Sequence, residues 1–116
     1  MRGPSFAGRD LRGRTFTNES LRGADFSRAD LTRANFSGSD LTCATFTGAT
    51  LTGANFSKTV ADHATFAYAH ATKANFSDAD LSFGDLSYAD FTRTNLTRTD
   101  LTGTNTTGCD MTGAKH

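Results

Sequence analysis

The sequence has no tryptophan, one proline, two cysteines and no long apolar run. Only 36% of its residues are hydrophobic, which is little for a conventional core of helices or sheets. The absence of about 18 consecutive apolar residues excludes a transmembrane helix, and the stretch through Phe6 lacks the apolar segment of a signal peptide. We therefore expect a cytoplasmic protein with no membrane partner, whose Cys43 and Cys109 are free thiols.

The net charge is zero, because 12 Lys and Arg balance 12 Asp and Glu. This balance argues against a strongly basic nucleic-acid-binding protein and against a strongly acidic nucleic-acid mimic, so we expect no direct nucleic-acid binding. The charge is uneven along the chain. Residues 1–33 hold seven Arg against four acidic residues, or +3, and residues 78–110 hold six Asp against two Arg, or −4.

A repeat of five residues runs from one end of the sequence to the other without an insertion. Every fifth residue from Phe6 to Met111 forms a column of 22 positions that are mostly Phe or Leu. The residue two places before this centre is mostly Ala, the one just before it Asp, Asn or Thr, and the one just after it Ser or Thr. Side chains alternate along an extended chain, so the central residue and the Ala point to the same side. A period of five therefore predicts a strand-like segment that turns a corner every five residues.

The order of Phe and Leu in the central column indicates how many sides each coil has. Phe and Leu alternate up to Leu51, so a three-sided coil would stack Phe on Leu, whereas a four-sided coil of 20 residues stacks Phe on Phe. Asparagines just before the centre also recur every 20 residues: Asn35, Asn55, Asn75 and Asn95. Stacked Asn side chains can hydrogen-bond to one another along a ladder. A two-sided coil also fits these periods, but it leaves little room for Phe inside.

The motif Ala-(Asp/Asn)-(Leu/Phe)-(Ser/Thr)-x recurs at residues 24–28, 29–33, 34–38, 54–58 and 79–83. On this motif the sequence resembles the pentapeptide-repeat family over almost its whole length. The resemblance implies an all-β fold, a right-handed quadrilateral parallel β-helix, with residues 1–116 as one domain. Its 22 centres make about 5.5 coils, and at about 4.8 Å per coil the rod is roughly 26 Å long.

The repeat is irregular between residues 58 and 73. Ala61 and Ala71 replace Leu at facing central positions of one coil, so either the coil narrows there or a small void remains, which would lower stability.

Aromatic side chains stand outside the core near this irregular coil. A four-sided coil places Tyr88 above Tyr68 and Phe83 above His63. Exposed aromatic residues are enriched at interfaces, so these four residues form a candidate interaction patch. A drifted repeat with no partner is the alternative.

The two ends of the coil form a second candidate surface. No capping helix is visible, so Phe6, Leu11 and Met111 form apolar end rungs with unpaired strand edges. We expect association through these ends, with a homodimer favoured over a head-to-tail chain of copies held by charge. The acidic end, which would attract a basic partner, consists of Asp80, Asp85, Asp90, Asp100 and Asp110.

The sequence gives no sign of catalysis. Asp62, His63 and Ser82 would lie near one another, but the repeat implies no cleft and no oxyanion donor beside them. His63 and His70 fall on different faces, so we expect no metal, no cofactor and no enzyme activity.

Two functions fit these features. The first is a non-catalytic protein-interaction or structural scaffold module. The second follows from the resemblance, because some members of the family bind DNA gyrase or topoisomerase as mimics of duplex DNA and protect against quinolones or peptide antibiotics. An unbroken repeat also fits a consensus-like design, although the irregular coil favours natural drift.

Overall fold

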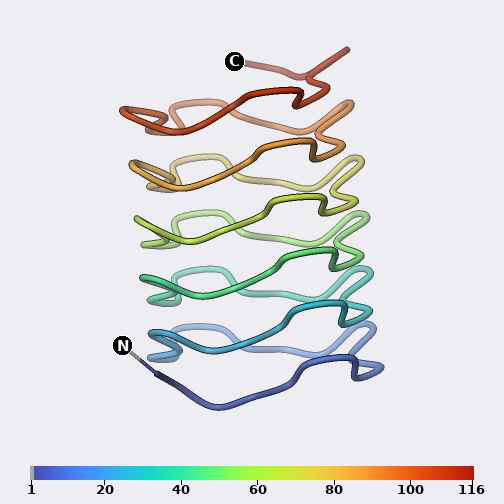
Figure 1. Ribbon diagram of the computed structural model, residues 1–116, viewed down its shortest axis with the longest axis vertical. Helices are drawn as coiled ribbons and strands as arrows, with labels where there is room; N and C mark the ends of the chain where they lie inside the picture. The colour runs from blue at the N-terminus through green and yellow to red at the C-terminus, as the bar shows by residue number, and fades with distance from the viewer. Residues whose placement is uncertain (1) are drawn as a thin grey trace.

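The computed structural model describes residues 2–116 and shows a rod of stacked coils (Figure 1), with extents of 31 × 23 × 22 Å. Every β-bridge is parallel and joins residues 20 apart, from Ser5 and Asp25 at one end to Asn95 and Lys115 at the other. Each coil therefore has 20 residues and four sides. The right-handed quadrilateral β-helix expected from the sequence is confirmed, and the two-sided coil is excluded.

The described residues form no helix and no continuous strand. Neighbouring coils are joined on each side by isolated single β-bridges. On each side, three backbone hydrogen bonds join neighbouring coils. On the first side, the Phe26 amide donates to the Thr45 carbonyl (2.7 Å), the Arg28 amide donates to the Thr47 carbonyl (2.9 Å), and the Asp25 amide donates to the Pro4 carbonyl of the preceding coil (2.9 Å). The backbone polar groups of the interior coils thereby find partners, as burial requires.

The four sides are named here by their central residues. Face 1 is centred on Phe6, Phe26, Phe46, Phe66, Leu86 and Thr106; face 2 on Leu11, Leu31, Leu51, Ala71, Phe91 and Met111; face 3 on Phe16, Phe36, Phe56, Phe76 and Leu96; face 4 on Leu21, Leu41, Ala61, Leu81 and Leu101.

All corners but one are turns closed by a hydrogen bond from the amide three residues beyond the centre, such as Ala29 N to Phe26 O (3.1 Å); after Phe16, the Glu19 amide donates to the Ser39 hydroxyl instead (3.0 Å). The third residue of every turn has a positive φ. Nine corners use Gly, as the sequence suggested, but thirteen use other residues, including Arg28 (57°) and Tyr68 (60°). This left-handed conformation costs a non-glycine residue roughly 1–2 kcal/mol. The backbone hydrogen bonds between coils on either side of each corner nonetheless fix this left-handed conformation. Large side chains therefore point outward along the four edges of the rod.

The core is a double stack of phenylalanines filled in by Leu and Ala. Phe26 lies parallel to Phe46 one coil away (ring centroids 5.1 Å apart, 4° between the planes) and edge-on to Phe36 across the coil (5.3 Å, 86°). Each fully buried Phe or Leu contributes roughly 1.5–3 kcal/mol. The Ala residues two places before the centres are buried against these rings, as the repeat predicted.

The asparagine column has the predicted register but not the predicted hydrogen bonds. Asn35 is bridged to Asn55, and Asn55 to Asn75. Each Oδ1, however, accepts the backbone N–H two residues further along its own coil, for example Ser57 N to Asn55 Oδ1 (2.9 Å). The expectation of amide-to-amide bonds between coils was therefore wrong, because the local turn competes for the same acceptor.

The irregular coil is filled from the coil that follows it. Ala61 and Ala71 are fully buried. Phe91, which follows Ala71 on face 2, lies 5.0 Å from the Phe76 ring and 6.3 Å from the Phe66 ring. Both of these rings belong to the coil of Ala71, so the larger side chain at position 91 uses space that a Leu at position 71 would occupy.

We therefore predict that Ala71→Leu lowers the free energy of unfolding by about 1–3 kcal/mol, through overpacking against Phe91. In the double variant Ala71→Leu, Phe91→Leu, the two changes should partly cancel. Denaturant unfolding of the four members of this cycle measures the coupling, and strictly additive losses would show that the two side chains do not share this space.

Candidate interaction surface

Two pairs of stacked rings stand on the two corners that border face 1. Phe83 lies above His63 (5.6 Å, 21°), and Tyr88 lies above Tyr68 (5.4 Å, 18°). Phe83 and both tyrosines are 57–58% exposed. The stacking predicted for these four residues is confirmed, and the structure places them on neighbouring edges of the rod. The interaction itself remains a proposal.

Glycines in the next coil let the upper rings lie against the backbone. A Cβ atom on Gly103 would come within 2.5 Å of the Phe83 ring, and one on Gly108 within 2.5 Å of the Tyr88 ring. Each ring therefore rests on a coil above it as well as on a ring or imidazole below it. The rings are held in place before any partner arrives, which lowers the entropy lost on binding.

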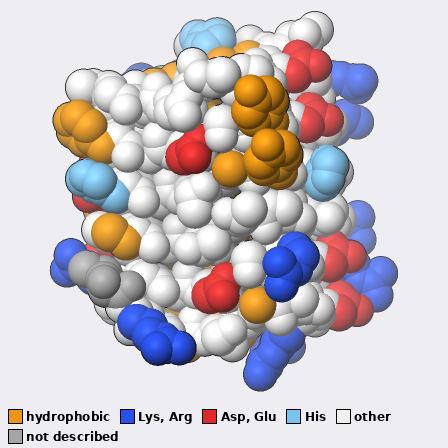
Figure 2. All heavy atoms as spheres, in the orientation of Figure 1, with side chains coloured by type: hydrophobic (Ala, Val, Ile, Leu, Met, Phe, Trp, Pro, Cys, Tyr) orange, Lys and Arg blue, Asp and Glu red, His pale blue; other side chains and the backbone are white. Residues whose placement is uncertain are grey.

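Carboxylates surround these rings, and cations are kept away from them. Between residues 60 and 110, faces 1, 2 and 4 and the two corners beside face 1 carry no Lys or Arg. Their carboxylates are Asp62, Asp80, Asp85, Asp90, Asp100 and Asp110. The cations of the same coils, Lys73, Arg93 and Arg98, lie on the two corners beside face 3. In Figure 2 the large hydrophobic side chains lie in the upper part of the view, and most blue side chains lie below them or along the right edge.

We call the aromatic residues His63, Tyr68, Phe83 and Tyr88 with these six carboxylates the aromatic–acidic surface. The acidic end expected from the sequence is therefore better described as an acidic side, which covers three faces of the C-terminal half. Sequence reasoning missed this because it summed charge along the chain instead of around the coil.

All of these carboxylates except Asp62 hold a backbone amide through Oδ1, and Asp90 Oδ2 also accepts the Thr72 hydroxyl (3.2 Å). Asp85 Oδ1 accepts the Ser87 amide (2.8 Å), and Asp90 Oδ1 accepts the Thr92 amide (3.0 Å). The backbone and hydroxyl hydrogen bonds from Thr92 hold the pKa of Asp90 below its ordinary value. The carboxylates of Asp100 and Asp110 have lowered pKa values through the same contacts with Thr102 and Thr112.

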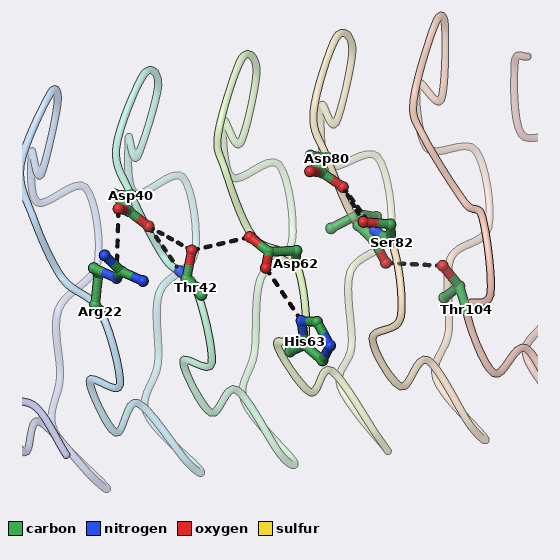
Figure 3. A network of polar contacts seen from close by, with 9 residues as sticks. Arg22, Asp40, Thr42, Asp62, His63, Asp80, Ser82 and Thr104 are labelled. Atoms are coloured by element: carbon green, nitrogen blue, oxygen red, sulfur yellow. Dashed lines mark hydrogen bonds and ion pairs between the residues drawn. The ribbon is translucent and has the colours of Figure 1, made fainter. Parts of the chain in front are cut away.

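The candidate catalytic residues do not form a catalytic arrangement. His63 Nδ1 lies 3.1 Å from Asp62 Oδ2 (Figure 3), but the Ser82 hydroxyl is turned to Asp80 Oδ1 at 2.5 Å. Burial raises the pKa of Asp62, but hydrogen bonds from His63 and Thr42 outweigh it and leave the pKa below its usual range. The network along face 4 thus ties neighbouring coils together and leaves no activated nucleophile.

The two ends of the rod differ. At the N-terminal end, Arg9, Arg14 and Glu19 occupy the position that Ala fills in later coils, and the Arg9 guanidinium lies 5.6 Å above the Phe6 ring. Leu11 is only 2% exposed, so its assignment to an open end rung was wrong: the coil above and its neighbours cover it. Met111 is half-buried at the other end, where the core contacts it from one side.

Both cysteines are free thiols, as expected from the sequence. Cys43 is exposed on a corner, and Cys109 is half-buried, where burial and the nearby Asp110 and Asp90 raise the pKa of its thiol to about 11. Within residues 2–116 there is no group of three or more metal-ligating side chains, and no helix is long and apolar enough to cross a membrane.

Comparison with known sequences identifies the repeat. The family described as pentapeptide repeats matches in eight copies, over residues 5–42, 20–57, 39–82, 62–98 and 74–113. The chain belongs to the pentapeptide-repeat family. No curated protein matches it individually.

Solved structures of other pentapeptide-repeat proteins share the fold. Rfr23 of the cyanobacterium Cyanothece 51142 is 24% identical, with a TM-score of 0.77 over 96% of this chain and 86% of its own. A protein of the Arabidopsis thaliana thylakoid lumen is 35% identical, with a TM-score of 0.60 over 90% of this chain and 66% of its own. Trypsin-treated QnrB1, a plasmid-mediated fluoroquinolone resistance protein, is 26% identical, with a TM-score of 0.69 over 95% of this chain; the match spans 58% of QnrB1.

The lowered carboxylate pKa values of this pentapeptide-repeat protein predict sensitivity to acid. A carboxylate whose pKa is depressed on folding stabilises the protein above its unfolded pKa of about 3.9, and this stability is lost as the pH falls through the lower folded value. We expect the thermal midpoint to fall below about pH 4. The thermal midpoint of the variant Asp90→Asn, Asp110→Asn should fall less steeply with decreasing pH. Its turns should remain intact, since Asn35 and Asn55 show that an amide oxygen accepts the same backbone N–H. Melting curves from pH 2 to 7 test this, and an unchanged acid limb would contradict it.

Proposed function

We propose that this protein is a non-catalytic interaction module that binds a basic protein segment through its aromatic–acidic surface. The observation that carries the proposal is that four exposed rings stand on the two corners of face 1, with six carboxylates on faces 1, 2 and 4, while the Lys and Arg of the same coils lie on the two corners beside face 3. Membership of the pentapeptide-repeat family supports a non-catalytic role, and nothing in the network around His63 supports a reaction.

An arginine or lysine side chain suits this surface for two reasons. A cation over a Tyr or Phe ring gains about 0.5–1 kcal/mol at an exposed site. The outward oxygens of Asp85 and Asp90 add a negative potential that draws the cation in and is screened by salt. Because the rings are already stacked, few side chains need to be ordered on binding.

Removal of both tyrosines should weaken binding of a fluorescently labelled oligo-arginine peptide by about five- to thirtyfold, from the loss of two cation–π contacts. The variant Tyr68→Gly, Tyr88→Gly suits the backbone, since Gly48 and Gly108 occupy the same corner column. Fluorescence anisotropy measures the affinity. In the unaltered protein, tyrosine emission reports the site directly, because Tyr68 and Tyr88 are its only tyrosines and it has no tryptophan.

The matched control is Asn18→Gly, which makes the same kind of change at a positive φ on a corner far from this surface. The control should bind as tightly as the unaltered protein. Equal affinity for all three proteins would show that the peptide senses charge alone and that the rings play no part.

The alternative function is binding of DNA gyrase in the manner of a DNA mimic. The likeness to QnrB1 and the acidic side of the rod support it. In a gyrase supercoiling assay with a quinolone, the unaltered protein should then restore activity, and Asp85→Asn, Asp90→Asn should restore less. No effect of either protein would leave the scaffold function as the better account. Homodimerisation through the uncapped coil ends, with Phe6 and Met111 in the end rungs, remains a proposal that serves either function.

A further inference from the structure

The zero net charge conceals a division between the sides of the rod. Face 3 with its two corners carries seven cations and one carboxylate, or +6, and since the chain is neutral the remainder carries −6. The cations are Arg14, Arg33, Lys58, Lys73, Arg93, Arg98 and Lys115. The one carboxylate, Asp78, is bonded to Arg98 at 2.6 Å. Face 3 is therefore the basic side of a neutral protein.

The asparagine column makes the same face rich in hydrogen-bond donors. The Oδ1 atoms of Asn35, Asn55, Asn75 and Asn95 accept backbone N–H groups at 2.9–3.0 Å. Their amide nitrogens bond to no other described residue, and none is a buried atom without a partner. Each Asn therefore offers two N–H donors to the outside, one coil apart from the next.

Face 4 carries acceptors at the equivalent position. Asp40, Asp80 and Asp100 hold backbone amides through Oδ1 in the same way (2.9–3.0 Å). The Oδ2 atoms of Asp80 and Asp100 accept no hydrogen bond from the described residues. Val60 stands between Asp40 and Asp80 in this column and is 46% exposed. Face 4 thus offers carboxylate oxygens around one apolar side chain.

We propose that face 3 of one copy docks side by side against face 4 of a second copy. Donors and acceptors would meet, charges of opposite sign would meet, and Val60 would be covered. Both columns repeat once per coil, at about 4.8 Å, so several pairs can form in one register. A partner with another spacing would match at one or two points only.

The contact uses two different faces, so each copy keeps one of them free for a further copy. Such heterologous contacts build assemblies larger than a dimer. A side of the rod measures at most 31 × 22 Å, so each copy covers roughly 700 Å2, less than the roughly 800 Å2 per partner of a stable complex. The association should therefore be weak, seen at high concentration and low salt, and lost as salt screens the charges.

The test is sedimentation of the full chain over a range of concentrations at low and high salt. The variant Asn55→Asp, Asn75→Asp turns the donors of face 3 into carboxylates without altering the turn, because Asp fills this position on the other faces. We expect the average mass of the unaltered protein to rise above that of a dimer at low salt, and the mass of this variant to stay at that of a monomer or a salt-resistant end-to-end dimer.

The matched control is Thr45→Asp, Thr65→Asp, which adds two carboxylates at the same position of face 1, beside Asp25 and Asp85. It should associate like the unaltered protein. Mixing the face 3 variant with Asp80→Asn, Asp100→Asn should restore association, since the first keeps face 4 and the second keeps face 3. Melting curves confirm that each variant is folded.

The proposal is overturned by any of three results: no association of the unaltered protein beyond a dimer at any concentration, association beyond a dimer that resists salt and survives the face 3 changes, or equal loss in the face 1 control. The second result would point to contact through the rod ends.

Discussion

The structure depends on one constraint: every residue must lie beside the residue 20 positions before it and the residue 20 positions after it. The backbone bonds between coils impose this, because the amide of each central residue and the amide before it pair with opposite neighbours. Large side chains can then stack only on the same column, which is why Phe recurs on faces 1 and 3 through four coils. The pair Ala71 and Phe91 shows that side-chain size can vary along a column while the register is kept. The volume missing from one coil is supplied by the next coil on the same face, and the bridges above and below keep their register.

The constraint also explains why the fold could be predicted and the surface could not. The period of Phe and Asn gives the number of sides directly, since only a 20-residue coil stacks like on like. The corner conformation could not be foreseen, because propensity assigns positive φ to Gly, and Tyr68, Phe83 or Arg98 give no local signal of it. There the ladder on both sides of the corner overrides the preference of the residue. The faces that carry the acidic residues could be predicted from the sequence, but only after the residues were arranged around a four-sided coil.

The residue before each centre has two separate roles: one atom of its side chain maintains the turn, and the other sets the chemistry of the surface. Its Oδ1 atom holds a backbone amide whether the residue is Asp or Asn, as Asp85 and Asn55 both show. The second atom of the same group faces outward, and it is an acceptor with a negative charge in Asp and a donor in Asn. A change between the two therefore alters what a face can bind and leaves the turn intact. This accounts for a rod whose core varies little from coil to coil and whose four sides differ in charge and hydrogen bonding.

The corners allow a similar freedom at an energetic cost. A non-glycine residue there is strained by roughly 1–2 kcal/mol, and Gly occurs in every corner column, so folding alone would favour Gly throughout. Stacking of Tyr88 on Tyr68 and of Phe83 on His63 recovers part of this energy, since aromatic pairs contribute about 0.5–1.5 kcal/mol. The rings still leave more than half of their surface in water. Stability alone gives little reason to hold four such side chains together on two neighbouring corners, whereas the cation-binding role proposed for this surface would account for them.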